Sequence, residues 1–267
     1  MSNHIKTNAI KARKNDASAI VCLTAYTAPM AQILDEYCDL ILVGDSMSMC
    51  LYGMNSTIGL SVDTMINHGH AVASHVKNAC VVVDMPYGSY ENSVDVARAN
   101  ARRIMDETGC DAVKLEGGMD MEETIRTIVN DGIPVMAHIG LQPQSVEKDG
   151  GYKIKGKTDA EMAKLVEDAH AVERAGAFAV VIEGTIESVA AHITQQTKIP
   201  TIGIGGSAEC DGQILVTEDM LGMLSGHTPK FAKKYANISD HIHKAVQEYS
   251  SEVKFRTFPS DEYTYQG

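Results

Sequence analysis

The sequence contains no tryptophan, and aromatic residues make up only 5% of its 267 residues. The interior must therefore be filled by aliphatic side chains and by the 14 methionines. No two cysteines have the Cys-x-x-Cys spacing of a zinc or redox site. We therefore expect the six scattered cysteines to be reduced and structural, and we do not expect a thiolate zinc site.

Positive charge is also scarce, because the formal net charge is -12. A nucleic-acid partner requires a basic face, so this balance argues against one. The sequence has no apolar run near 20 residues, and residues 1–16 lack the apolar core of a signal peptide. We therefore expect no membrane partner and a cytoplasmic location.

Short runs rich in branched aliphatic residues recur along the chain with helical patterns between them. The runs that predict buried strands are residues 19–24, 40–44, 81–84, 112–115, 135–139, 178–183, 201–204 and, most weakly, 214–217. Helices are predicted over residues 93–108, 120–131 and 159–175, followed by Gly109, Gly132 and Gly176 as helix ends.

The length suits one large domain, and no linker of domain size interrupts the pattern. Repeated strand and helix units favour an α/β fold, a closed (β/α)8 TIM barrel, over an open doubly wound sheet. We predict one domain over residues 1–267, with short polar N-terminal and C-terminal extensions.

Four of the predicted strands end in a carboxylate: Asp45, Asp84, Glu116 and Glu183. In parallel α/β folds the ligand site lies beyond the carboxyl ends of the strands, so these acids are expected to converge. Clustered carboxylates repel one another unless a cation neutralises them or one of them stays protonated. The pattern therefore predicts a site for metal or acid–base chemistry.

Asp45 and Asp84 follow neighbouring strands, and their oxygen ligands suit Mg²⁺. The alternative for each aspartate alone is that it caps the following helix. Glu183 follows three apolar residues, and a desolvated carboxylate is a stronger base, which suits a general base.

Lys114 and Glu116 occupy alternate positions of one strand, so their side chains point to the same face. They could form a simple buried ion pair, or Lys114 could bind an anionic carboxylate or keto oxygen beside the metal. His138 lies at the end of the next strand. It could be a structural histidine of the interior or a residue that contacts the substrate, and both interpretations stay open.

Weaker signals lie elsewhere. Gly205-Gly206-Ser207 could form a phosphate nest or only a turn, and the alternating lysines of residues 153–157 could form a basic flap or a surface turn. His68 and His70 are two residues apart and do not share a helix face, which argues against a metal pair, and the same holds for His241 and His243.

Several stretches resemble the ketopantoate (3-methyl-2-oxobutanoate) hydroxymethyltransferase family of pantothenate biosynthesis, in order from about Thr24 to Phe258. These stretches are Leu-Val-Gly-Asp45-Ser46, Val-Asp84-Met-Pro-Tyr-Gly-Ser-Tyr90, Val-Lys114-Leu-Glu116-Gly-Gly, Ala-His138-Ile-Gly-Leu-Gln-Pro-Gln-Ser145, Gly-Gly-Tyr-Lys-Ile-Lys-Gly156, Gly-Ile-Gly205, Cys-Asp211-Gly-Gln-Ile-Leu-Val and Pro-Lys230-Phe-Ala-Lys-Lys-Tyr235.

The resemblance implies a (β/α)8 barrel with one Mg²⁺ per subunit at its carboxyl-end face. It implies that the metal ligands are Asp45 and Asp84, supported by Glu116, and that the base is Glu183. The residues implied to bind substrate are Ser46, Lys114, His138 and the two aspartates. It also implies 5,10-methylenetetrahydrofolate as the one-carbon donor and a homo-oligomer, commonly a decamer; the folate-binding residues stay unknown.

The chain departs from the family pattern at Thr27, at Asn55 and at Gly206-Ser207. Two alternatives from other classes stay open. A Mg²⁺-dependent lyase or mutase of the phosphoenolpyruvate mutase and isocitrate lyase type shares the barrel, but its Cys-Gly-His loop is not in this sequence. A non-catalytic metabolite binder would have no need of Glu183.

Overall fold

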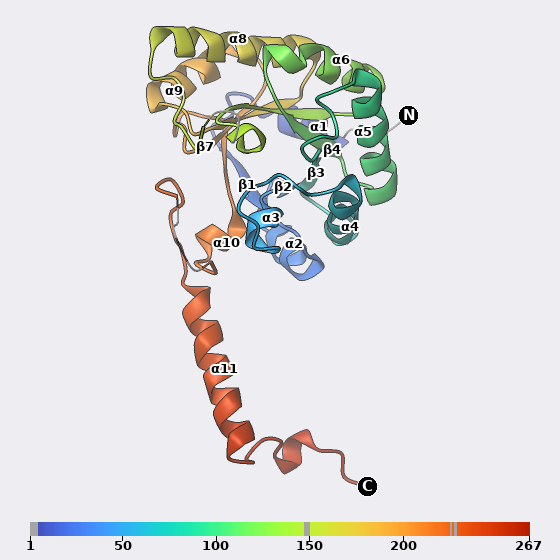
Figure 1. Cartoon of the computed structure of the whole chain (residues 1–267), viewed down its shortest axis with the longest axis vertical. Helices are drawn as coiled ribbons and strands as arrows, with labels where there is room; N and C mark the ends of the chain where they lie inside the picture. Colours follow the sequence, from blue (N-terminus) through green and yellow to red (C-terminus); the bar gives the residue numbers. More distant parts are fainter. Residues whose placement is uncertain (1–4, 147–149, 225, 227–228) are drawn as a thin grey trace. The chain divides into compact units, whose positions relative to one another are not determined.

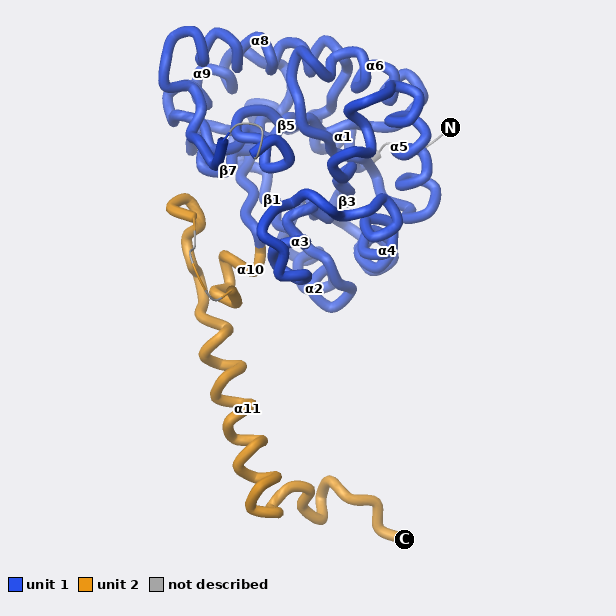
Figure 2. Tube along the Cα trace, in the orientation of Figure 1, with its two compact units in different colours: residues 1–216 blue, residues 217–267 orange. Residues whose placement is uncertain are grey.

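The structure is a computed structural model that describes residues 5–146, 150–224, 226 and 229–267. The chain divides into two compact units, residues 1–216 and residues 217–267, which are coloured separately in Figure 2. We describe each unit by itself. The expectation of one domain over residues 1–267 stays a prediction.

The first unit is built on eight parallel strands that close into a barrel in the order of the sequence, β1 to β8 (Figure 1). The strands are β1 (Ile20–Thr24), β2 (Leu40–Val43), β3 (Cys80–Asp84), β4 (Ala112–Glu116), β5 (Val135–Gly140), β6 (Ala179–Glu183), β7 (Thr201–Ile204) and β8 (Gly212–Leu215). The predicted barrel is confirmed, and the open doubly wound sheet is excluded because β8 pairs with β1.

The weakest strand prediction was misplaced by two residues. We expected residues 214–217, whereas β8 begins at Gly212 and ends at Leu215. Gly212 pairs with Ile20 on one side and Ile202 on the other, so the two neighbouring strands determine where β8 begins. Residues 205–211, all described, form turns and bends, as expected for a connection too short for a regular helix.

The helices of the first unit are α1 (Ile5–Lys11), α2 (Ala28–Leu34), α3 (Met47–Cys50), α4 (Val62–Ala73), α5 (Val94–Thr108), α6 (Glu122–Asn130), α8 (Asp159–Ala175) and α9 (Glu187–Gln196). Two 3₁₀ turns, η1 (Met119–Met121) and η2 (Pro143–Ser145), follow β4 and β5. Helix α5 begins after its N-cap Ser93, and both Gly109 and Gly176 end helices in the left-handed conformation, as predicted.

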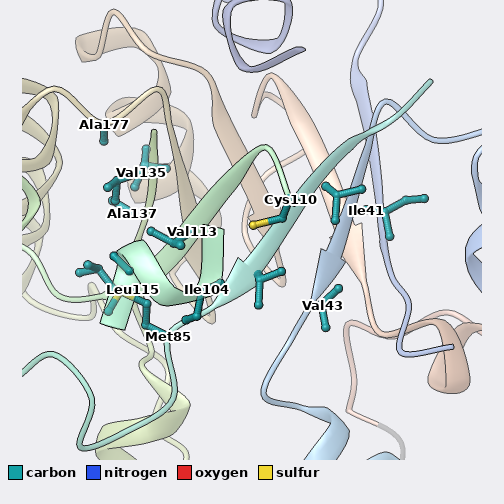
Figure 3. Close-up of a cluster of buried hydrophobic side chains, with 14 of the residues drawn as sticks. Ile41, Val43, Met85, Ile104, Cys110, Val113, Leu115, Val135, Ala137 and Ala177 are labelled. Atoms are coloured by element: carbon teal, nitrogen blue, oxygen red, sulfur yellow. The ribbon is translucent and has the colours of Figure 1, made fainter. Parts of the chain in front are cut away.

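Side chains alternate between the two faces of each strand, so the hydrophobic core has two layers. One layer packs between sheet and helices, and Figure 3 shows part of it, with Val113 and Leu115 of β4 near Ile104 of α5. The other layer fills the barrel with inward residues from all eight strands, such as Leu40, and Ile10 of α1 packs against it. Because side chains alternate between faces, the inward row of β4 runs Ala112, Lys114, Glu116.

The second unit contains α10 (Thr217–Met220), α11 (Ile238–Lys254) and the 3₁₀ turn η3 (Asp261–Tyr263). All of α11 is described, and none of its residues is buried. In the part of the chain that the structure describes, we find no helix with the length and apolar character needed to cross a bilayer. The six cysteines all lie in the described part and are free thiols.

Candidate active site at the carboxyl ends of the strands

Ionisable side chains gather inside the barrel at the carboxyl ends of β3 to β6. Strand register brings them together, because Asp84 is the Cα partner of Lys114 and Glu116 is the partner of His138. Glu183 ends β6 opposite Gly140 of β5. The first four side chains are almost completely buried, and the Glu183 side chain is 16% exposed. The structure therefore brings together the acids that the sequence placed at the strand ends.

Asp45 and Asp84 are in direct contact. The backbone N–H of Asp45 donates a hydrogen bond to Oδ2 of Asp84 at 2.9 Å. The short helix after Asp45 begins at the N-cap Ser46, and helix α5 begins at the N-cap Ser93. The interpretation of these two aspartates as helix caps is therefore not supported, because the Asp45 carboxylate contacts Gln144 and the Asp84 carboxylate contacts Lys114.

Lys114 is the cation inside this acidic cluster. Its Nζ lies 3.1 Å from Oδ1 of Asp84, and both side chains are 4% exposed or less. Burial by itself would lower the pKa of Lys114, but Asp84, Glu116 and Asp45 together raise it, so the ammonium stays charged.

One ammonium does not neutralise the three carboxylates of Asp45, Asp84 and Glu116. Burial and the neighbouring Asp84 raise the pKa of Asp45 to about 7. Burial and Asp45 raise the pKa of Glu116. A site in which desolvation and like charge oppose ionisation is suited to a further cation.

His138 lies between Lys114 and Glu183. The Lys114 ammonium can only donate, so Nδ1 of His138, 3.3 Å away, must accept, and the proton of the neutral ring is on Nε2. That Nε2 lies 3.3 Å from Oε2 of Glu183 and has no hydrogen-bond partner among the described residues. Burial and Lys114 lower the pKa of His138, which keeps the ring neutral.

Ser46 lies beside Asp45 and is partly buried. Its Oγ is 2.8 Å from the hydroxyl of Tyr26, so the side chain is held by a hydrogen bond. Ser46 lies beyond the end of β2 and next to Asp45 in the chain, and its role in substrate binding stays a prediction.

The donor set fits a hard divalent cation. Across residues 5–146, 150–224, 226 and 229–267, no three His, Cys, Asp or Glu side chains already form a ready-made metal site. Within the same residues, however, Oδ1 of Asp84 is buried and faces the Lys114 ammonium at 3.1 Å without forming a well-directed hydrogen bond. The side chains of Asp45, Asp84 and Glu116 all offer carboxylate oxygens, the kind of ligand that Mg²⁺ prefers.

Sequence reasoning assigned no role to two buried residues of this site, Tyr90 and Gln144. Gln144 in η2 contacts both Asp45 and Glu116, and the Tyr90 hydroxyl contacts Gln144. Both follow inward strand residues by six positions, Tyr90 after Asp84 and Gln144 after His138. That position on loops beyond the strand ends was the available signal.

Of the other predicted motifs, only the lysine segment approaches the cluster. Ser207 donates to Glu187 and accepts from the N–H of Glu209, which supports a structural turn after β7. His68 bonds Tyr26 and Tyr52, whereas His70 lies near Ser74, so the two histidines have separate partners. His241 and His243 are exposed on α11. The backbone of Lys155 pairs with Gly184 and Ile186, next to Glu183.

Sequence comparison matches almost the whole chain to one family. The model described as ketopantoate hydroxymethyltransferase matches residues 4–261. A Mesorhizobium japonicum protein named 3-methyl-2-oxobutanoate hydroxymethyltransferase is 59% identical over 255 residues, which covers 96% of this chain and 89% of that protein. The protein of the same name from Paramagnetospirillum magneticum is 52% identical, covering 98% of this chain and 95% of its own length.

Solved structures resemble the fold at much lower identity. Phosphonopyruvate hydrolase in complex with oxalate and Mg²⁺ has a TM-score of 0.62 at 12% identity, covering 98% of this chain and 92% of that one. 2,3-Dimethylmalate lyase, a member of the PEP mutase/isocitrate lyase superfamily, has a TM-score of 0.60 at 16% identity, covering 97% and 91%. These similarities concern the barrel alone.

Proposed function

Because the chain belongs to the ketopantoate hydroxymethyltransferase family, we propose that it transfers a hydroxymethyl group from 5,10-methylenetetrahydrofolate to 3-methyl-2-oxobutanoate, with Mg²⁺ and Glu183. The product would be 2-dehydropantoate (ketopantoate), on the route to pantothenate. The family match favours this transferase over the lyase and over the metabolite binder. The observation that carries the proposal is the acidic cluster of Asp45, Asp84 and Glu116 with Glu183 across from it.

Asp45 and Asp84 would hold the metal, and Glu116 would support it. A Mg²⁺ ion held there would polarise the keto oxygen as a Lewis acid, a contribution of several kcal/mol. The Lys114 ammonium, held by Asp84, would bind the anionic end of the keto acid, and the Ser46 hydroxyl would donate a further hydrogen bond.

Glu183 would act on the C3 proton of the substrate. Its carboxylate lies at the more open side of the cluster, where a substrate carbon can approach it. A positioned base of this kind contributes roughly 10²–10⁴ in rate. Nε2 of His138 faces Oε2 of Glu183 at 3.3 Å, so its proton would steady that oxygen while the other oxygen of the carboxylate takes the C3 proton.

The remaining steps balance with water and folate. The C3 carbon of the resulting enolate forms a bond to the methylene carbon of the folate, and the bonds between that carbon and the folate nitrogens break. Water supplies the new hydroxyl group, and tetrahydrofolate leaves. None of these later steps requires a base positioned at C3. Removal of the C3 proton is therefore the step that isolates the role of Glu183.

The test is proton NMR of 3-methyl-2-oxobutanoate in D₂O with the purified protein. We expect a Mg²⁺-dependent loss of the C3 signal, its absence with Glu183→Gln, and formation of ketopantoate when methylenetetrahydrofolate is added. Exchange without product would indicate a different one-carbon acceptor or donor. No exchange with the wild-type protein and Mg²⁺ would refute the proposed chemistry.

We also propose that the protein is a homo-oligomer, with ten subunits as the expectation from family resemblance. Exposed apolar residues at positions 242, 246, 249 and 253 of α11 form one stripe at helical spacing: Ile242, Val246, Tyr249 and Val253. Contiguous exposed apolar surface of this kind marks interaction sites, which supports association of subunits.

A further inference from the structure

Gln144 connects two of the three carboxylates of the acidic cluster. Its side-chain Nε2 donates to Oδ2 of Asp45 at 2.8 Å, and its backbone N–H donates to Oε2 of Glu116 at 3.1 Å. Asp45 follows β2, Glu116 ends β4 and Gln144 lies after β5. One residue therefore fixes two carboxylates from separate strands, and Gln144 itself is 3% exposed.

The orientation of the Gln144 amide is determined by its neighbours. Besides Asp45, Nε2 donates to the backbone oxygen of Met85 at 3.0 Å, so both of its N–H groups are used. A flipped amide would direct Oε1 at two acceptors, a carboxylate oxygen and a carbonyl oxygen, which is unfavourable. The carbonyl Oε1 instead accepts from the hydroxyl of Tyr90.

Tyr90 completes a directed chain of hydrogen bonds. The backbone N–H of Glu116 donates to the Tyr90 hydroxyl at 3.2 Å, the hydroxyl donates to Gln144, and Gln144 donates to Asp45. Tyr90 is 3% exposed, so its hydroxyl would be costly to bury without these partners. Every donor in the chain points toward the carboxylate of Asp45.

We propose that Gln144 is a positioning residue whose side chain fixes the Asp45 carboxylate for metal binding, beside the Glu116 carboxylate that its backbone N–H holds, and that Tyr90 acts through Gln144 by holding its amide. This inference deepens the proposed function and rests on it for the identity of the metal. Gln144 donates to one oxygen of each carboxylate, which also fixes the position of the second oxygen of each group. Outer partners of metal ligands of this kind change metal affinity by about 10- to 100-fold when they are removed.

The first experiment compares Gln144→Met with the wild type. Mg²⁺ binding to the substrate-free protein is measured by titration calorimetry, alongside the melting temperature and the kcat and KM of the transferase reaction. We expect Mg²⁺ affinity to fall by about 10- to 100-fold, with a matching loss of kcat at subsaturating Mg²⁺. A fall in melting temperature with unchanged Mg²⁺ affinity would show a merely structural role and overturn the inference.

A matched control lies beside Tyr90. Oγ of Ser89 is buried and has no hydrogen-bond partner among the described residues. Ser89→Ala therefore removes a hydroxyl from the same loop and leaves the hydrogen bonds of Tyr90 and Gln144 intact. We expect Ser89→Ala to keep wild-type Mg²⁺ affinity. An equal loss in this variant would attribute the effect to the loop and contradict the role of Gln144.

A double-mutant cycle tests the part played by Tyr90. Tyr90→Phe alone should lower Mg²⁺ affinity, whereas the same substitution in the Gln144→Met background should cause less than about a twofold further loss. Losses that multiply would show that Tyr90 acts independently of Gln144.

The crystal structure of metal-free Gln144→Met separates failure of this inference from failure of the proposed function. We expect the Asp45 carboxylate to leave its position, because its side-chain donor is lost. This outcome does not depend on catalysis. An unmoved Asp45 carboxylate would overturn the inference, whereas a displaced Asp45 carboxylate in the variant, together with a wild-type protein that lacks transferase activity, would overturn the proposed function alone.

Discussion

Nζ of Lys114 lies 3.1 Å from Oδ1 of Asp84, and the two residues are Cα partners on neighbouring strands inside the barrel. Both side chains are almost fully buried. If one partner were removed, water could not solvate the charge that remains. The pair therefore differs from an exposed ion pair such as that of Arg103 and Glu107, whose side chains are about half exposed.

The first prediction concerns this buried pair. Lys114→Met leaves the Asp84 carboxylate buried without its cation, which should lower the free energy of unfolding by about 3–5 kcal/mol. Urea unfolding without added divalent cations measures the loss. Glu107→Ala, which breaks the exposed pair, should change the free energy of unfolding by about 1 kcal/mol or less. Equal effects of the two substitutions would contradict the importance of burial.

The second prediction concerns the metal. If Mg²⁺ binds only the folded protein, a concentration 100 times its Kd should raise the free energy of unfolding by about 2.7 kcal/mol, and a chelator should remove the gain. Asp45→Asn should lose most of this gain because it replaces a proposed ligand. Asp63→Asn, at an exposed acid of α4, should keep the whole gain. A gain that survives Asp45→Asn would place the ion elsewhere.

The third prediction uses the close packing of β5 against the end of β6. Gly140 has φ of 94°, and a Cβ at this position would collide with the backbone oxygen of Glu183 and lie 2.8 Å from Oγ1 of Thr185. Gly140→Ala should therefore displace the base, lowering kcat by about 100-fold and stability by about 1–3 kcal/mol.

Gly132→Ala is the control for this substitution. Gly132 also has positive φ, 79°, but a Cβ there would meet nothing within 4 Å. It should lose about 1 kcal/mol of stability from backbone strain while kcat stays unchanged. Unchanged kcat in Gly140→Ala would show that Glu183 is not displaced or does not limit the reaction.

The fourth prediction concerns pH and Asp211 beside the barrel strands. Burial would raise the pKa of Asp211, but hydrogen bonds from Lys14, Asn15 and Thr201 lower it below its usual value. Its stabilising effect is therefore present above the ordinary aspartate pKa, near 3.8, and is lost as the pH falls through the lower folded-state pKa.

Asp211→Asn should accordingly cost about 1.5–3 kcal/mol at pH 7, and its difference from the wild type should shrink below pH 4. Thermal unfolding at several pH values measures this. Asp16→Asn, at a half-exposed acid paired with Arg13, should change stability by about 0.5 kcal/mol or less. A difference that grows toward acid pH would contradict the sign.

The fifth prediction concerns α11. Val246→Glu places a charge in the exposed apolar stripe and should dissociate the proposed oligomer into smaller species, as measured by light scattering after gel filtration. Gln247→Glu adds the same charge one residue away, outside the stripe, and should leave the oligomer intact. Unchanged mass in the Val246→Glu variant would exclude the stripe as an interface.

The sequence by itself determined the repeating strands, the glycine ends of α5 and α8, and the shared face of Lys114 and Glu116. These features follow from local rules, because side chains alternate along a strand and only glycine easily adopts the left-handed helix end. The carboxyl ends of parallel strands share one face of a barrel, so the convergence of the acids was also predictable.

Only the tertiary structure decided the limits of β8, the neighbours of each ring nitrogen of His138 and the contacts of Gln144. Gln144 is separated from Asp45 by 99 residues, and its amide is oriented by Tyr90, 54 residues away. Local periodicity contains no information about such contacts, because the direction of each hydrogen bond depends on which groups the closed barrel brings within 3 Å.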